Sequence, residues 1–240
     1  MLDQVDVGAA PWVLMYHSIA DTNVDPLNIT ASPATFERQM LWLRRHGLRG
    51  TTLSETLAAR RTGAQGLVGL TFDDGYADFA TTAVPILRRY GFTATVYVLA
   101  DRLGGVNEWD QGAPRKRLMT AAQVRAVASA GMEVGSHGLR HVSLPTLSRG
   151  ELTTEVEHSR NVLSELLDQE ISGFAYPYGH FGDREVDAAQ AAGYGHACGV
   201  GRAKPDSSHA VPRSFIGERD TGIRLAAKKA RHTLFWRRSR

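Results

Sequence analysis

The sequence is poor in cysteine. Cys198 is the only one in 240 residues, so the chain cannot form an intramolecular disulfide or a thiolate metal cluster. We expect this thiol to be a small buried apolar side chain, with a catalytic thiol as the alternative. The apolar content of 42% is ample for a hydrophobic core that needs no disulfide.

Long hydrophobic runs are also missing. No apolar stretch is long enough to cross a membrane, and residues 1–6 lack the basic region and apolar stretch of a signal peptide. The expected location is therefore the cytoplasm, with association at a membrane surface as a further option. The sequence has no internal repeat, low-complexity segment or interdomain linker, so we expect residues 1–240 to form a single domain.

Acidic residues are absent from residues 224–240, which contain seven Lys and Arg. The formal net charge of the whole chain is +3, and the net charge of the chain without this segment is −4. This predicts a basic C-terminal helix from about residue 221 that packs on the domain or contacts an anionic membrane surface. No nucleic-acid partner is expected, and the oligomeric state is left open. The apolar face of this helix would consist of Ile223, Ala226, Ala227, Ala230 and Leu234.

Short apolar runs alternate with helix-like segments along the chain. Helix starts are marked by Ser32-Pro33, by Thr120 and by Ser148, which are typical N-terminal capping residues. Alternation of this kind predicts a parallel sheet built from βαβ units, and about seven strands favour an α/β barrel over a doubly wound open sheet. The expected strands are residues 11–17, 66–72, 93–99, 132–136, 173–176, 194–200 and 211–216.

Chemically unusual residues follow four of these expected strands. They are His17, Asp73-Asp74, His137 and Tyr178, each at or just after a strand end. In a parallel α/β barrel, these carboxyl ends form the rim on which active sites are built. Each residue also has a simpler interpretation, such as a solvated Asp-Asp-Gly turn, but their common position favours one site.

His137 and His141 are spaced like a metal-binding pair. Four residues apart, they would share one face of a helical turn, although two surface histidines would show the same spacing. One carboxylate of Asp73-Asp74 completes a set of two His and one Asp that leaves coordination positions open for water and substrate. An open-site metal lowers the pKa of bound water toward roughly 7, and the second carboxylate can then act as general base.

Three motifs occur in a fixed order along the chain: Thr71-Phe72-Asp73-Asp74-Gly75, His137-x-x-x-His141 and Tyr176-Pro177-Tyr178-Gly179. Together with the opening residues 14–19 and the Asn107-x-Trp109 loop, they resemble the polysaccharide deacetylases, the NodB-homology domain of carbohydrate esterase family 4. The resemblance covers most of the chain.

The family pattern implies a distorted (β/α)7 barrel that removes acetyl groups from N-acetylated sugars. Asp73 would be the general base, and the metal would be bound by Asp74, His137 and His141. The expected ion is zinc, with nickel, cobalt and iron(II) as alternatives that suit the same ligands.

Further roles follow from the same resemblance. In relatives that open with a Tyr-His strand end, the histidine is the general acid, which corresponds to His17 here. Pro177 and Tyr178 correspond to the segment that lines the substrate groove and offers a backbone N–H to the oxyanion. From its residue type, Trp109 is expected either to stack on a sugar ring or simply to pack.

The chain departs from the family pattern in three places. Ala175 stands where the family often has an arginine that orients the general base, and Arg213 on the last expected strand is the candidate replacement. The usual C-terminal Leu-x-His motif is not evident, since His209 does not fit its context, and His17 is expected to fill that role. Gly138 replaces the usual Ser or Thr after the first metal histidine.

These features predict metal-dependent hydrolytic N-deacetylation of a saccharide that contains N-acetylhexosamine, in which a metal-bound water attacks the acetamide. The alternatives are a metal-dependent hydrolase of small cyclic amides and a carbohydrate-binding relative that has lost catalysis. The substrate is left open among peptidoglycan, chitin oligomers, poly-N-acetylglucosamine, a glycolipid and a sugar nucleotide.

Overall fold

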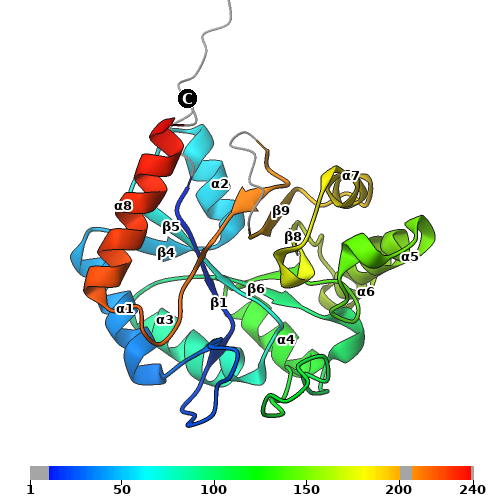
Figure 1. The fold of residues 1–240 in the computed structure, drawn as a ribbon, viewed down its shortest axis with the longest axis horizontal. Coiled ribbons are helices and arrows are strands. Elements are labelled where there is room, and N and C mark those ends of the chain that lie inside the picture. Colours follow the sequence, from blue (N-terminus) through cyan, green and yellow to red (C-terminus); the bar gives the residue numbers. More distant parts are fainter. Residues whose placement is uncertain (1–10, 201–206, 239–240) are drawn as a thin grey trace, which may run out of the picture.

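The computed structural model describes residues 11–200 and 207–238, with side chains as far as Leu234 in the second range. Strands of one parallel sheet occupy the centre of the molecule, and helices surround them (Figure 1). Neighbouring strands follow the order β10-β9-β8-β7-β6-β5-β1-β11, and β4 pairs with β5. Their bounds are β1 Val13–Tyr16, β4 Arg49–Thr51, β5 Leu67–Phe72, β6 Thr95–Val98, β7 Glu133–Ser136, β8 Gly173–Ala175, β9 His196–Gly199, β10 Val211–Pro212 and β11 Ser214–Phe215.

The last strand-forming segment closes the sheet into a barrel. The run expected as one strand at 211–216 is divided at Arg213 into β10, which pairs with β9, and β11, which pairs with β1. One short segment therefore bridges both edges of the sheet. This closure confirms the expected distorted α/β barrel and excludes the open, doubly wound alternative.

The helices begin where the sequence signals predict. The side chain of Ser32 caps α1, and Thr120 and Ser148 begin capping boxes at α4 and α5. No helix in the described ranges is both long and apolar enough to cross a membrane. The α-helices are α1 Pro33–Arg45, α2 Leu53–Arg61, α3 Val84–Arg89, α4 Ala121–Ser129, α5 Arg149–Thr153, α6 Ser159–Leu167, α7 Asp183–Ala191 and α8 Gly222–Arg238.

Several short elements were not expected from the sequence. Two segments are π-helical, η1 before α3 and η4 between α5 and α6, and two-residue strands β2 and β3 pair with each other after β1. A π turn keeps the helical pattern of apolar residues, and two residues are too few to show strand alternation, so neither leaves a sequence signal. The bounds are η1 Phe79–Ala83, η4 Thr154–His158, β2 Ser18–Ile19 and β3 Thr30–Ala31; three 3₁₀ turns are η2 Ala100–Arg102, η3 Leu144–Thr146 and η5 Pro177–Gly179.

The apolar face expected to pack α8 on the domain points to solvent instead. Ile223 is 86% exposed and Leu234 is 59% exposed, whereas Leu225 is fully buried. Leu225 lies on a different side of the helix from the expected face, so this expectation is wrong. The helix is attached on the side of Leu225, and Gly222 lies against the ring of Trp42.

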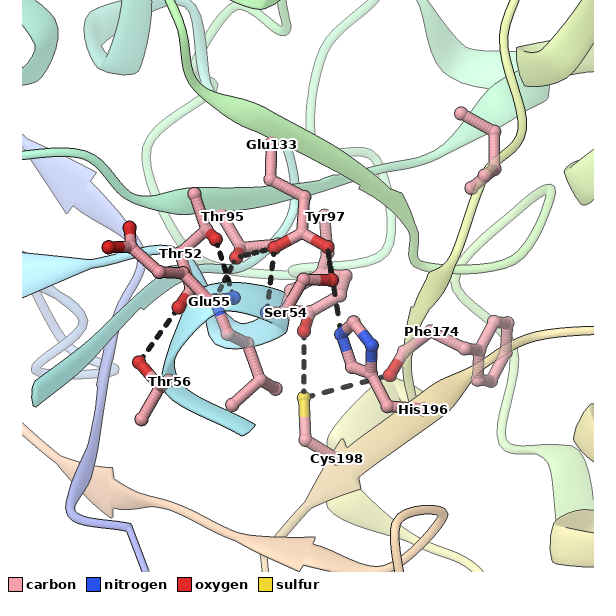
Figure 2. Close-up of polar contacts among 12 residues, drawn as sticks. Thr52, Ser54, Glu55, Thr56, Thr95, Tyr97, Glu133, Phe174, His196 and Cys198 are labelled. Atoms are coloured by element: carbon pink, nitrogen blue, oxygen red, sulfur yellow. Dashed lines mark hydrogen bonds and ion pairs between the residues drawn. The ribbon is translucent and has the colours of Figure 1, made fainter. Parts of the chain in front are cut away.

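A polar cluster closes the barrel at the amino-terminal ends of its strands (Figure 2). The carboxylate of Glu133, at the start of β7, accepts hydrogen bonds from the hydroxyls of Ser54 and Thr95, both at 2.5 Å. It also accepts one from the Ser54 N–H at 3.2 Å, in the first turn of α2. A carboxylate at a helix N-terminus satisfies free N–H groups and interacts favourably with the helix dipole. Glu133 therefore fixes α2 across this end of the barrel, which we call the floor.

Cys198 lies inside the barrel, next to this polar cluster (Figure 2). Its thiol donates a hydrogen bond of 3.3 Å to the hydroxyl of Tyr97 and packs beside Leu53 and Ala175. Burial raises the pKa of Cys198 to about 11. Cys198 is thus a buried structural residue, as expected. Its raised pKa disfavours the thiolate form that a catalytic cysteine needs.

Candidate active site

The carboxyl ends of four strands bring the expected site residues to the rim opposite the floor. His17 follows β1, Asp73 and Asp74 follow β5, and His137 follows β7. Tyr178 lies in η5, just beyond β8. Because all these strands are parallel, their carboxyl ends meet on one side of the barrel, as the sequence predicted.

Asp74, His137 and His141 converge on one point. The Nε2 atoms of the two histidines lie 3.4 and 3.3 Å from the same oxygen, Oδ1 of Asp74. Tetrahedral ligands at bond lengths of roughly 2.1 Å are separated by about 3.4 Å, so these atoms are spaced like ligands of one ion. Oδ1 of Asp74 is buried and has no hydrogen-bond partner among the described residues. The three residues therefore fit a divalent metal.

His137 is held in the tautomer that a metal ligand needs. Its Nδ1 lies 2.7 Å from the carbonyl oxygen of Ala175. Because a carbonyl only accepts, Nδ1 carries the hydrogen and the lone pair is left on Nε2, which faces Asp74. Ala175 thus supports the site through its backbone, at the position where the family pattern often has an arginine.

The segment from His137 to His141 is an irregular loop, and the expectation of a helical turn is wrong. Gly138 has a φ of 83° and His141 a φ of 62°, both in the left-handed region that a right-handed helix excludes. The two imidazoles share a site because of these loop angles. The i, i+4 spacing alone does not bring them together.

Glu155 holds this loop in place, and the sequence analysis missed it. The side chain is completely buried, and its carboxylate accepts hydrogen bonds from the Leu139 N–H at 2.8 Å and from Nε of Arg140 at 2.7 Å. Glu155 lies in η4, where a carboxylate in a helical pattern resembles a solvent-facing residue. Only its burial against the loop reveals its function in positioning His137 and His141.

Asp73 is bound by Arg213 through two parallel hydrogen bonds. Nη1 of Arg213 lies 2.6 Å from Oδ1, and Nη2 lies 2.7 Å from Oδ2. Both side chains are buried. Burial by itself raises the pKa of Asp73, but Arg213, with smaller contributions from His137 and His17, outweighs this effect, so the pKa lies below its ordinary value. Asp73 is therefore an ionised carboxylate inside the protein.

The backbone turns between the two adjacent carboxylates, so that Asp73 faces Arg213 and Asp74 faces the histidines. Asp74 has a φ of 70° and Gly75 a φ of 68°. A Cβ atom at Gly75 would lie 2.9 Å from a methyl group of Val98, so only glycine fits here. The Asp-Asp-Gly sequence is a buried strand end with two divergent acids, and a solvated turn is excluded.

His17 lies on the same rim, with its ring centroid 6.0 Å from that of Phe215. Its Nδ1 is buried and has no hydrogen-bond partner within the described ranges. Burial lowers the pKa of His17, while the negative charges of Asp74 and Asp73 oppose this shift. The site thus contains an imidazole nitrogen that is not committed to a structural hydrogen bond.

Two aromatic residues cover the outer side of His141. Trp109 stacks on the imidazole with ring centroids 4.7 Å apart, and Tyr178 contacts it edge-on at 4.4 Å. The loop that carries Trp109 is fixed by Asn107, whose amide group donates to Asp110 and accepts from the backbone. One face of Trp109 is therefore occupied by packing, and Tyr178, 48% exposed, lies at the surface of the site.

The sequence model of one family, polysaccharide deacetylase, matches residues 60–197, more than half of the chain. The chain belongs to the polysaccharide deacetylase family. The matched range contains Asp73-Asp74, His137 and His141, whereas His17 and Arg213 lie outside it. The expected family is thereby confirmed.

Individual relatives are similar over most of the chain. YxkH of Bacillus subtilis (strain 168), assigned provisionally to the polysaccharide deacetylases, is 28% identical over 185 residues, which are 76% of this chain and 61% of YxkH. The poly-beta-1,6-N-acetyl-D-glucosamine N-deacetylase of Staphylococcus aureus (strain MSSA476) is 24% identical over 205 residues, 80% of this chain and 69% of that protein. The chain thus spans about three fifths of the length of YxkH and somewhat more of the staphylococcal enzyme.

A solved structure shows the same fold. The deacetylase PplD of Streptococcus pyogenes, in complex with acetate, superimposes with a TM-score of 0.77 at 24% sequence identity. The superposition covers 92% of this chain and 98% of PplD. It extends over nearly the whole barrel, including regions outside the matched range of the family.

Proposed function

We propose that this protein removes the acetyl group from N-acetylglucosamine units of a glycan by metal-dependent hydrolysis. The observation that carries this proposal is a buried, ionised carboxylate, Asp73, beside a set of three metal-binding side chains at one barrel rim. Membership of the polysaccharide deacetylase family supports the class of reaction.

The metal would be held by Asp74, His137 and His141, and zinc is the ion we expect for two imidazoles and one carboxylate. When bound, such an ion polarises the acetamide carbonyl and lowers the pKa of water. Glu155 and the Ala175 carbonyl keep the ligands in position. The proton transfers of the reaction would be carried out by other side chains, Asp73 and His17.

Asp73 would take a proton from the attacking water, because Arg213 keeps its carboxylate ionised and fixes its orientation. As the water oxygen bonds to the acetyl carbon, negative charge moves to the carbonyl oxygen, toward which the backbone N–H of Tyr178 would donate. His17 would give a proton to the nitrogen as the C–N bond breaks. One water is consumed, and the products are acetate and a free amine.

We propose a polymer of N-acetylglucosamine as substrate. The staphylococcal relative is named for the poly-β-1,6-linked polymer, which is therefore the first glycan to test. Tyr178 and the accessible part of Trp109 border the site and would contact the sugar units, since aromatic rings pack well against sugar faces.

The test is acetate release from poly-N-acetylglucosamine, chitin oligomers and peptidoglycan with zinc supplied, using Asp73→Asn as the inactive control. Release that depends on both zinc and Asp73 supports the proposal. Hydrolysis of small cyclic amides without acetate release would favour the alternative hydrolase. Saccharide binding by the zinc-loaded protein without any acetate release would favour a binding protein that has lost catalysis.

A further inference from the structure

Exposed arginines gather on the floor of the barrel, at the opposite end from the candidate active site. Helices of a parallel α/β barrel run opposite to its strands, so the last turns of α1 and α3 lie on the floor. Helix α2 begins at the floor beside Glu133 and lies across it, and Arg60 in its last turn lines a cavity with Leu67, the first residue of β5. Each of these three helices ends in two consecutive arginines, and β4 begins with another. The exposed floor arginines are Arg44, Arg45, Arg49, Arg61, Arg88 and Arg89, and Arg60 beside them is half-buried.

Contacts between neighbouring elements show that these helix ends belong to one surface. The guanidinium of Arg44, at the end of α1, lies 5.1 Å from the ring centroid of Tyr90, directly after α3. Leu48, between α1 and β4, lines the same cavity as Arg60 and Gly63 at the end of α2. The three arginine pairs are therefore neighbours around one half of the floor.

Few acidic residues offset this charge. Arg49 pairs with Glu55 at 2.6 Å, and Arg89 pairs with Glu37 at 2.8 Å. Exposed pairs of this kind contribute little and are screened by salt. These two glutamates face six exposed arginines, so positive charge is in excess on this half of the floor. The end of α6 on the other half is followed by Asp168 and Glu170.

Helix α8 extends the basic surface. It starts near the rim, where Arg224 and Lys228 line a cavity with Thr30 and Phe215, and its later turns border the cavity that contains Arg60. Figure 1 shows its C-terminal end beside α2, at the top of the view. The helix contains no acidic residue, and Leu234 near its floor end is 59% exposed.

Helix stability alone does not account for this arrangement. A cation in the last turn interacts favourably with the helix dipole, which explains one basic residue at a helix end. Three adjacent pairs on one face repel one another, and this repulsion is relieved by an anionic partner. The charged face is broad, an exposed leucine borders it, and it leaves the active-site rim free.

We propose that the floor, together with the C-terminal half of α8, docks on an anionic phospholipid surface and turns the active-site rim away from it. Nucleic-acid-binding surfaces usually add aromatic stacking platforms or a helix that enters a groove. The floor offers arginines at helix ends and a leucine, which suit headgroups and the acyl boundary. Each basic residue near such a surface increases binding by about fivefold.

The experiment is co-sedimentation of the full chain with phosphatidylcholine vesicles that contain phosphatidylserine, compared with phosphatidylcholine alone. The floor variant is Arg45→Gln, Arg61→Gln and Arg88→Gln. Its matched control, Arg117→Gln, Arg149→Gln and Arg219→Gln, removes the same charge from exposed positions away from the floor. We expect the floor variant to bind about 100-fold more weakly and the control to bind nearly as well as the original protein.

Salt provides a measurement that needs no variant. Because the screening length falls from about 10 Å at 0.1 M to 3 Å at 1 M ionic strength, binding to the anionic vesicles should decrease steeply over this range. Salt-independent binding, equal losses in floor and control variants, or no binding to anionic vesicles would each overturn the proposal. Tighter binding to duplex DNA than to these vesicles at equal salt would overturn it in favour of a nucleic-acid partner.

Discussion

Arg213 and Asp73, 140 residues apart in the sequence, form a buried pair with two hydrogen bonds of 2.6 and 2.7 Å. The two parallel bonds fix the carboxylate plane as well as its charge. We propose that this pair supplies the orientation that the family pattern often assigns to an arginine at the position of Ala175.

Replacing Arg213 with Gln should raise the pKa of Asp73, because burial then acts without the opposing guanidinium. In the original protein, Asp73 stays ionised until the pH falls below its ordinary pKa range. The acidic limb of kcat/KM against pH should therefore move to higher pH in the variant. Arg213→Lys is the control and should shift the limb less, since it keeps the positive charge. An acidic limb at the same pH in Arg213→Gln would contradict this electrostatic effect.

Asp73→Asn should keep the fold and the metal but lose turnover. The amide has nearly the same shape and cannot accept the proton of water, and loss of a general base typically costs about 10²–10⁴-fold. Acetate release and metal content should be measured on the same preparation. A decrease of less than tenfold with full metal content would reject Asp73 as the base.

His137→Ala should lower the bound zinc from about one equivalent to a small fraction, because one of three ligands is lost. Metal analysis after gel filtration measures this directly. The matched control is His180→Ala, an exposed histidine outside the three-ligand set, which should keep its zinc. Full occupancy in His137→Ala would contradict the assignment.

His17→Ala should lower turnover far more than metal content. If His17 protonates the departing amine, an activated ester, whose leaving group needs little protonation, should be affected much less than an amide. Equal losses on both substrates would show that His17 positions the site and donates no proton. The comparison requires the two substrates to be assayed with the same zinc-loaded protein.

Acid should destabilise the protein through His196 on the floor. Burial lowers the pKa of His196, although Glu133 opposes this shift. Below the ordinary pKa of about 6.5, the unfolded chain binds this proton more readily than the folded one, so the free energy of unfolding falls as the pH decreases. In His196→Gln this dependence should be weaker between about pH 5 and 6.5, whereas His180→Gln should retain it. Identical slopes in both variants would exclude His196 as the cause.

Features that depend on the local pattern of residues could be predicted from the sequence. Apolar runs predicted the strands of the barrel sheet except β4, which was not expected. Residue types directly after those runs predicted the rim that carries Asp73, Asp74 and His137. Capping residues such as Ser32 predicted the starts of helices. These signals depend on residues that are close together in the sequence, so they can be recognised without knowledge of the fold.

Features that depend on contacts between distant segments could not be predicted in the same way. The position of Arg213 was suggested only by the missing arginine at Ala175, because its pairing with Asp73 requires closure of the barrel. Glu155 acquires its importance from burial against a loop whose Leu139, the partner of its carboxylate, precedes it by 16 residues. The backbone angles of the His137–His141 loop, and the exposure of the apolar face of α8, likewise arise from packing.

The division of residues 211–215 into β10 and β11 has a consequence for the order in which the site is assembled. During synthesis, Asp74, His137 and His141 leave the ribosome well before Arg213, which follows His141 by 72 residues. Until that segment joins β9 to β1, Asp73 has no guanidinium to keep it charged within the barrel. The same segment therefore completes the barrel and brings the guanidinium to Asp73, so that a chain ending before it would keep Asp74, His137 and His141 and lack the partner of Asp73.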